Sequence, residues 1–230
     1  MNLLSVCIPT YEMKGLGVEF LKYSFDILSK QTFKDFDVII SDHSKDDFIE
    51  KLCNEYKNKL DIHYYKNTKN IGKSSSNINN AIIHATGKLI KILFQDDFLF
   101  NEKSLEEIVK NFDLEKDKWL ITACIHSKDG INFFKPFYPK YNNKIHLGNN
   151  TISSPSVLTI LNKNPLPFDE NLIWLMDVEY YKRCYNKFGN PKIVNEINVV
   201  NRIGEHQVTN SKINILIKIK ETFYTLLKKK

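Results

Sequence analysis

Residues 70–99 read NIGKSSSNINNAIIHATGKLIKILFQDDFL, and the rest of the chain is organised around this stretch. A polar loop leads into a helical segment that Gly87 ends, and the apolar residues 89–94 then predict a short buried strand. Asp96 and Asp97 follow at the carboxyl end of that strand. Adjacent carboxylates repel each other, so one interpretation is a site for a hard divalent cation with oxygen ligands. The other is a solvated turn, and these two residues alone do not decide between them.

The residues before this stretch alternate between short apolar runs and helical spacing. Strands are expected at residues 3–8, 37–40, 62–65 and 89–94, and helices at residues 19–30, 45–56 and in the central segment. Pro9 is expected to stop the first strand. This alternation predicts an α/β fold with a mostly parallel central sheet and helices on both faces.

Ligands of such sheets bind outside the carboxyl ends of the strands. Thr10, Asp42, Asn70 and the pair Asp96 and Asp97 all follow predicted strands. This convergence favours a ligand site over a solvated turn at the acidic pair.

The second half of the chain is less regular. Helices are expected at residues 105–112 and 172–188, strands at 119–125 and 193–200, a short element at 155–161, and a long loop at 128–150. Asp177 falls in the first turn of the second helix, after an apolar segment, which suggests a functional acid. The alternative is a charge that complements the helix dipole, a role that Glu179 fits better.

Composition excludes several classes of protein. The length of 230 residues allows one sizeable domain, and the net charge of +6 is interspersed with acids and accompanied by no nucleic-acid motif. Four widely separated cysteines argue against a zinc site of the usual spacing and against a disulfide scaffold. No signal peptide is apparent, and no stretch approaches the roughly 20 apolar residues that span a bilayer. We expect a cytoplasmic protein.

Residues 211–230, SKINILIKIKETFYTLLKKK, predict a basic amphipathic helix after a domain that covers residues 1–210. The apolar residues expected on one face are Ile213, Leu216, Ile217, Phe223, Tyr224 and Leu227, and six lysines and one glutamate occupy much of the rest. Such a helix can lie on an anionic membrane, which predicts a peripheral location on the inner face of the cytoplasmic membrane. Docking on its own domain or on a partner chain is the alternative.

Motifs in the order SVCIPTYE, VIISDHSKDD, NIG…ATGKLIKILFQDD and WLMDVEYYKRC resemble those of glycosyltransferase family 2, from residue 3 to about residue 209. The resemblance implies the GT-A fold, a Rossmann-like sheet that binds nucleotide sugars. It further implies a metal-dependent, inverting transfer from a UDP-sugar to a saccharide hydroxyl, in bacterial surface-glycan or lipid-linked oligosaccharide synthesis. The expected cofactor is Mn²⁺ or Mg²⁺.

The resemblance also implies roles for individual residues. Pro9, Thr10 and Tyr11 would line the nucleotide pocket, and Asp42 would hydrogen-bond the uracil ring. Asp97 would bind the metal directly, with Asp96 near the ribose or the metal, and Asp177 would be the catalytic base. His206 resembles a histidine that approaches the metal or diphosphate in some members, although a surface histidine is equally consistent with its position.

The chain departs from the family pattern at two places. Its acidic motif is QDD, with Gln95 before the acids, and Asn77 stands where many members carry an arginine. Phosphate neutralisation is therefore expected from Lys73 or the metal, beside Asn70 and Gly72 in the donor site. These departures leave open a catalytically impaired scaffold that binds sugar nucleotides. A sugar nucleotidyltransferase is a further alternative, although residues 9–17 match its glycine-rich loop poorly.

Overall fold

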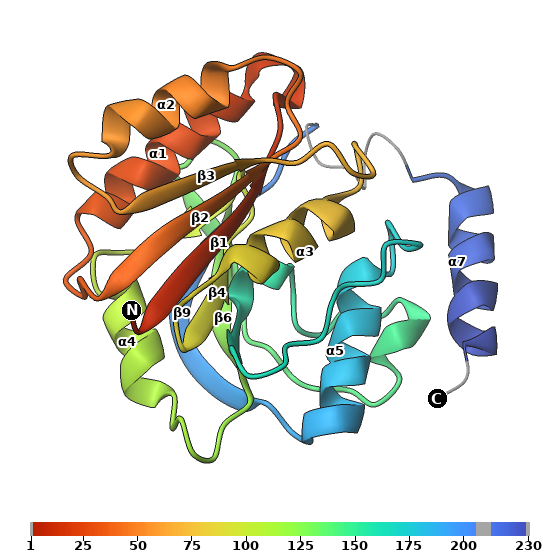
Figure 1. Cartoon of the computed structure of the whole chain (residues 1–230). Helices are drawn as coiled ribbons and strands as arrows, with labels where there is room; N and C mark the ends of the chain where they lie inside the picture. The colour runs from red at the N-terminus through yellow and green to blue at the C-terminus, as the bar shows by residue number, and fades with distance from the viewer. Residues whose placement is uncertain (1, 206–212, 229–230) are drawn as a thin grey trace.

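The computed structural model describes residues 2–205 and 213–228. Within these ranges, nine strands form one sheet in the order β3-β2-β1-β4-β8-β6-β9-β5, and β7 pairs with β6. Figure 1 shows the sheet as the centre of the molecule, with helices on both of its faces. The predicted α/β architecture is confirmed.

The first half of the chain forms the parallel part of the sheet. Its strands are β1 (Leu4–Thr10), β2 (Phe36–Asp42), β3 (Ile62–Lys66) and β4 (Leu89–Ile92), and all three pairings among them are parallel. The connections contain the helices α1 (Gly17–Ser29), α2 (Phe48–Tyr56) and α3 (Ser74–His84), with the short 3₁₀ turn η1 (Met13–Gly15) after β1. The polar residues that follow these strands therefore meet at one edge, as predicted.

The second half mixes strand directions. It comprises β5 (Phe98–Leu99), α4 (Ser104–Asn111), β6 (Trp119–Ser127), β7 (Phe133–Phe137), η2 (Ile145–Leu147), η3 (Pro155–Val157), β8 (Leu158–Leu161), α5 (Met176–Phe188) and β9 (Lys192–Arg202). The strand β8 is antiparallel to both of its neighbours, β4 and β6, whereas β6 and β9 are parallel. The segment expected to be a long loop contains β7, an exposed strand whose side chains show no buried face for a sequence pattern to reveal.

Alternating side chains divide the core between the two faces of the sheet. On β1, Val6 and Ile8 pack with α1 and α2, whereas Cys7 belongs to the opposite core with α3 and α5. Tyr180 and Tyr181 on α5 are fully buried, as expected of packing residues. All four cysteines are buried and free.

Two predicted boundaries differ from the structure. The strand β1 continues through Pro9 to Thr10, because a proline near the end of a strand removes only its own N–H from the ladder. The helix α3 ends at His84, before Gly87. A Cβ atom at Gly87 would lie 2.6 Å from the backbone nitrogen of Ser5, so the glycine allows the chain to approach β1 closely.

The C-terminal helix α7 (Ile215–Leu227) lies at the periphery of the molecule, beside the region of α5 (Figure 1). The polar contacts that hold it there involve Glu221, Tyr224 and Lys228. Among the helices in the described ranges, none combines the length and apolar character that crossing a bilayer requires.

Candidate active site

A cavity of about 510 Å³ opens at the carboxyl ends of β1 and β4. Its lining includes the loop after β1, the loop after β2, the loop before α3, residues 94–97 after β4, residues 154–155, and the start of α5. Of the predicted site residues, those that line the cavity are Pro9, Tyr11, Gly72, Gln95, Asp96, Asp97 and Asp177. The topology therefore brings most of the predicted site together at the expected edge of the sheet.

Gln95 connects the loop after β1 to the end of β4. Its side chain is buried, its Oε1 accepts a hydrogen bond from the Tyr11 backbone N–H at 2.9 Å, and its Nε2 donates to the Gly17 carbonyl at 2.8 Å. Within that loop, Met13 and Lys14 have φ values of 45° and 55°, in the left-handed region that non-glycine residues rarely adopt. The amide therefore holds a strained loop in place, a task that needs one donor and one acceptor and that a carboxylate cannot perform.

Replacement of Gly17 by Ala is expected to displace this loop. The added Cβ would lie 2.3 Å from the Tyr11 carbonyl oxygen and 2.8 Å from Nε2 of Gln95, so the backbone must move. If the cavity binds UDP, as the family resemblance implies, we expect the affinity to fall by about tenfold or more, since misplaced binding groups are costly. Calorimetric titration of UDP measures the effect, with Glu19→Ala on the exposed side of α1 as the control. Unchanged affinity in Gly17→Ala would contradict the role of Gln95 in holding this loop for nucleotide binding.

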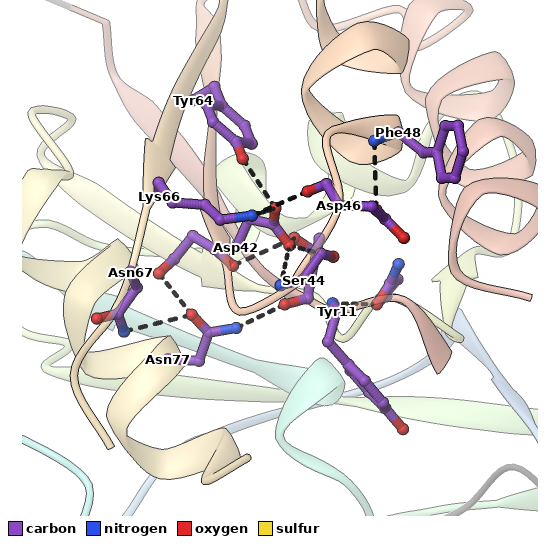
Figure 2. A network of polar contacts seen from close by, with 12 residues as sticks. Tyr11, Asp42, Ser44, Asp46, Phe48, Tyr64, Lys66, Asn67 and Asn77 are labelled. Atoms are coloured by element: carbon purple, nitrogen blue, oxygen red, sulfur yellow. Dashed lines mark hydrogen bonds and ion pairs between the residues drawn. The ribbon is translucent and has the colours of Figure 1, made fainter. Parts of the chain in front are cut away.

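Asp42 is the centre of a buried polar network, shown in Figure 2. Its Oδ1 accepts hydrogen bonds from Thr10 Oγ1 at 3.2 Å and from the N–H and Oγ of Ser44 at 2.9 and 2.6 Å. Its Oδ2 accepts from the Tyr64 hydroxyl at 2.8 Å and from Lys66 Nζ at 3.2 Å. Burial, together with the hydrogen bond to Asp42, raises the pKa of Tyr64 well above its ordinary value.

This network bears on the predicted roles of Thr10 and Asp42, which stay predictions. Neither residue lines the cavity, and both carboxylate oxygens of Asp42 are taken up by protein donors. A contact between Asp42 and a uracil ring would require some of these bonds to break. In this structure Asp42 instead joins the ends of β1, β2 and β3.

Asn77, which stands where many family members carry an arginine, extends the same network. Its Nδ2 donates to the Thr10 carbonyl at 2.9 Å and its Oδ1 accepts from Ser41 Oγ at 2.7 Å (Figure 2). Asn77 reaches the cavity wall, but its amide groups serve to connect α3 to the two strand ends.

The basic groups at the cavity differ from the one expected. Lys14, His43 and Lys45 line it, whereas Lys73 and Asn70 do not. Asn70 instead donates to Glu170 at 2.6 Å. Burial lowers the pKa of His43. In the sequence, these residues could be noticed only by their position in or beside the TYE and SDH motifs. An isolated lysine in a loop carries no pattern that predicts where its ammonium group lies.

The two adjacent acids have different surroundings. Asp97 is buried, its Oδ1 accepts from the Arg202 backbone N–H at 3.0 Å, and its Oδ2 accepts from Asn201 Nδ2 and Ser154 Oγ at 2.8 and 3.0 Å. Burial, followed by the charge of Asp96, raises the pKa of Asp97 well above its ordinary value. Asp96 is less buried and lines the cavity. The donors around Asp97 fasten the end of β4 to the end of β9 and leave Asp96 as the more accessible carboxylate.

The donor set bears on the predicted metal. Within residues 2–205 and 213–228, no group of three or more His, Cys, Asp or Glu side chains has an arrangement that could hold a metal ion. His206, one of the two predicted ligands, lies outside the described residues. Mg²⁺ is commonly held by one or two carboxylates together with substrate phosphates. The carboxylates of Asp96 and Asp97 at the cavity fit that kind of site.

Asp177 lies in the first turn of α5 and lines the cavity. Its Oδ1 accepts from the Val178 N–H at 2.8 Å, and its Oδ2 accepts from Asn150 Nδ2 at 2.8 Å. Burial raises the pKa of Asp177 to about 6. The carboxylate is therefore ionised at neutral pH yet more basic than an ordinary aspartate. Asn150 was not singled out from the sequence, because it lies in a segment without periodic pattern.

A family model described as Glycosyl transferase family 2 matches residues 5–168. An uncharacterized glycosyltransferase of Rickettsia typhi is 24% identical over 244 residues, which cover 99% of this chain and 72% of that protein. The GalNAc(5)-diNAcBac-PP-undecaprenol beta-1,3-glucosyltransferase of Campylobacter jejuni is 31% identical over 141 residues, which cover 61% of this chain and 43% of that protein.

Solved structures show the same fold. TarS 1–349 of S. aureus in complex with UDP-GlcNAc has a TM-score of 0.69 at 19% identity, over 98% of this chain and 72% of that one. The mannosyltransferase PcManGT of Pyrobaculum calidifontis, in complex with GDP-Man and Mn²⁺, has a TM-score of 0.64 at 15% identity, over 99% and 70%. The chain spans 43% of a longer TarS structure. These likenesses confirm the expected GT-A architecture.

Proposed function

The chain belongs to glycosyl transferase family 2, and on that premise we propose that it moves a sugar from a UDP-sugar to a hydroxyl group of a saccharide acceptor, with inversion. The observation that supports this most strongly is that Asp96, after β4, and Asp177, at the start of α5, line one cavity. We assign Asp96 to the donor side and Asp177 to the acceptor side. Residues 1–210 would form the catalytic domain and residues 211–230 an accessory helix.

Asp177 is the proposed base. As the acceptor oxygen forms a bond to the anomeric carbon, its proton passes to the Asp177 carboxylate, and the bond from that carbon to the diphosphate breaks. UDP leaves with the electron pair of the broken bond. One such displacement inverts the anomeric centre. The hydrogen bond from Asn150 holds the Asp177 carboxylate in orientation and leaves lone pairs of Oδ2 for the proton.

Negative charge grows on the leaving diphosphate, and the chain supplies cationic groups to meet it. Lys14 and Lys45 line the cavity and are the proposed partners of the phosphates. A bound Mn²⁺ or Mg²⁺ would add positive charge at the same oxygens. We propose Asp96 rather than Asp97 as its direct protein ligand, because Asp96 is the less buried of the two acids and lines the cavity.

The choice of donor and acceptor follows the relatives. TarS, which shares the fold, was solved with UDP-GlcNAc, and this favours a UDP-sugar over the GDP-mannose found with PcManGT. The Campylobacter relative is named for an undecaprenol-linked saccharide, and we propose a lipid-linked saccharide acceptor here. With such an acceptor, the proposed site of the reaction is the surface of the cytoplasmic membrane.

Calorimetric titration of UDP and GDP, with and without Mn²⁺, tests the donor site. We expect Mn²⁺-dependent UDP binding in the wild type and loss of the Mn²⁺-dependent part in Asp96→Asn at unchanged Tm. Asp97→Asn is expected to lower Tm, because an amide N–H₂ group would face donors that now point at a carboxylate.

UDP binding that ignores both Mn²⁺ and Asp96→Asn would contradict the metal site. Tighter binding of GDP would overturn the proposed donor. Nucleotide binding without any transfer would favour the scaffold alternative, and no nucleotide binding at all would contradict both the transfer and that scaffold.

A further inference from the structure

The helix α7 is attached to the domain through a buried charge. Glu221, the sole acid of α7, is 4% exposed, and its carboxylate accepts hydrogen bonds from the backbone N–H groups of Ile173, Trp174 and Leu175 at 2.8, 2.9 and 2.9 Å. These residues directly precede α5, where Asp177 lies. A carboxylate at a helix N-terminus satisfies orphan donors and complements the helix dipole. The helix α7 is thus fixed to the start of α5.

Two further side chains strengthen this attachment. Lys228 Nζ lies 2.5 Å from Asp169 Oδ2 and 2.6 Å from Glu179 Oε1, and the Tyr224 hydroxyl donates to Asp169 at 3.0 Å. Glu221, Tyr224 and Lys228 are spaced by three and four residues and so share one side of α7. The side that faces the protein is therefore the polar one.

The opposite side of α7 carries a stripe of exposed apolar residues, which we call the outer stripe. Its members, each between 48% and 78% exposed, are Ile215, Leu216, Ile219, Phe223, Leu226 and Leu227. The expectation of one apolar face that includes Ile217 and Tyr224 is corrected, because both of these residues lie on the inner side. A surface helix normally buries its apolar stripe against the core, and α7 has the reverse orientation.

Charge indicates what covers the outer stripe. Lys218 and Lys220 are exposed at its two edges, and the ammonium group of Lys218 lies 5.5 Å from the centre of the Trp174 ring. The one acid of α7 is turned inward, so the exposed side of the helix is apolar and cationic only. A second copy of the chain would bring lysines against lysines, whereas an anionic lipid surface would meet them with opposite charge.

We propose that the outer stripe inserts into the headgroup layer of an anionic membrane and thereby holds the acceptor side of the cavity against the bilayer. Ile213, just before α7, lines the cavity, as do Ile173 and Trp174, whose N–H groups bind Glu221. The proposed lipid-binding helix α7 is therefore joined directly to the start of α5, which carries Asp177. The role of a lipid-linked acceptor in this inference rests on the proposed function. Membrane binding by the outer stripe does not depend on it.

Vesicle co-sedimentation of the full chain tests whether the outer stripe binds anionic membranes. The probes are vesicles of phosphatidylcholine alone and vesicles in which part of it is replaced by phosphatidylglycerol. The test variant is Leu216→Ser/Phe223→Ser/Leu227→Ser, and the matched control is Ile83→Ser/Phe48→Ser/Ile131→Ser, three similarly exposed residues on other parts of the protein. We expect the wild type and the control to bind the anionic vesicles. The test variant should bind them at least about tenfold more weakly.

Three outcomes would overturn the inference. One is equal binding by the test variant and the wild type, and another is equal binding to both kinds of vesicle. The third is a wild-type dimer in light scattering and a monomeric test variant, since the outer stripe would then be covered by a second copy of the chain. Sedimentation requires no turnover, so failure of the proposed transfer would appear separately, as absence of product with soluble and lipid-linked acceptors alike.

Discussion

Asp177→Asn is expected to lower kcat by about 10²- to 10⁴-fold, the usual contribution of a general base, while UDP affinity stays unchanged. The substitution preserves the shape of the side chain and one oxygen that can accept from the Val178 N–H. It removes the lone pair that takes the acceptor proton. Single-turnover measurements with saturating UDP-sugar give the rate, and calorimetry gives the UDP affinity.

The pH dependence provides the control for this role. Because burial raises the pKa of Asp177 to about 6, wild-type activity should fall as pH decreases through about 6, when the carboxylate becomes protonated. Residual activity of Asp177→Asn should lack this step. A rate that survives the substitution with the same pH step would remove Asp177 from the role of base.

The same pKa shift sets the sign of its effect on stability. The folded protein binds the proton of Asp177 more tightly than the unfolded chain, so the stability that this group contributes falls as pH rises from about 4 to about 6. At neutral pH, removal of this buried charge opposes the cost of an amide N–H₂ group that faces the Asn150 donor, so Asp177→Asn is expected to unfold close to the Tm of the wild type. This outcome separates loss of catalysis from loss of fold.

Glu221→Ala is expected to reduce the free energy of unfolding by about 3 kcal/mol or more, because three N–H groups lose a charged acceptor. Denaturant unfolding measures the change, and hydrogen exchange at residues 173–175 reports the freed N–H groups. Transfer to a lipid-linked acceptor should fall, with a higher KM for the acceptor and little change for the donor. The outer stripe itself is untouched, so binding to anionic vesicles should persist.

Glu221→Gln is the conservative variant, since its amide oxygen still accepts but carries no charge. It is expected to fall between the wild type and Glu221→Ala in stability, whereas Glu115→Ala, an exposed acid far from α7, should behave as the wild type. Full stability of Glu221→Ala with slow exchange at residues 173–175 would show that the buried carboxylate is not what fixes α7.

Local patterns in the sequence were sufficient to predict the parallel part of the sheet. Alternating side chains and short apolar runs identify β1, β2 and β4, because burial on the two faces of a sheet requires apolar residues at those positions. The placement of Asp96 at the cavity followed from the rule that the ends of parallel strands meet at one edge, whereas Asp177 was expected there from the family resemblance. The segment that contains β7 escaped prediction because its residues are exposed and so follow no burial pattern.

The chemistry of individual side chains was decided by tertiary contacts. Whether a carboxylate is free to bind a ligand depends on donors from distant segments, as with Lys66 and Asp42, 24 residues apart, or Arg202 and Asp97, 105 residues apart. Gln95 holds the loop after β1 only because the fold places the backbone of Tyr11 and Gly17 within hydrogen-bond distance of its side chain. No local pattern records such partners.

The helix α7 illustrates the division between the two levels. Its sequence alone determined that it is helical and amphipathic, because spacing along the chain sets which residues share a face. The direction of its apolar side was decided by the fold: the N–H groups before α5 attract the single buried carboxylate of Glu221, and that attraction turns the outer stripe toward solvent.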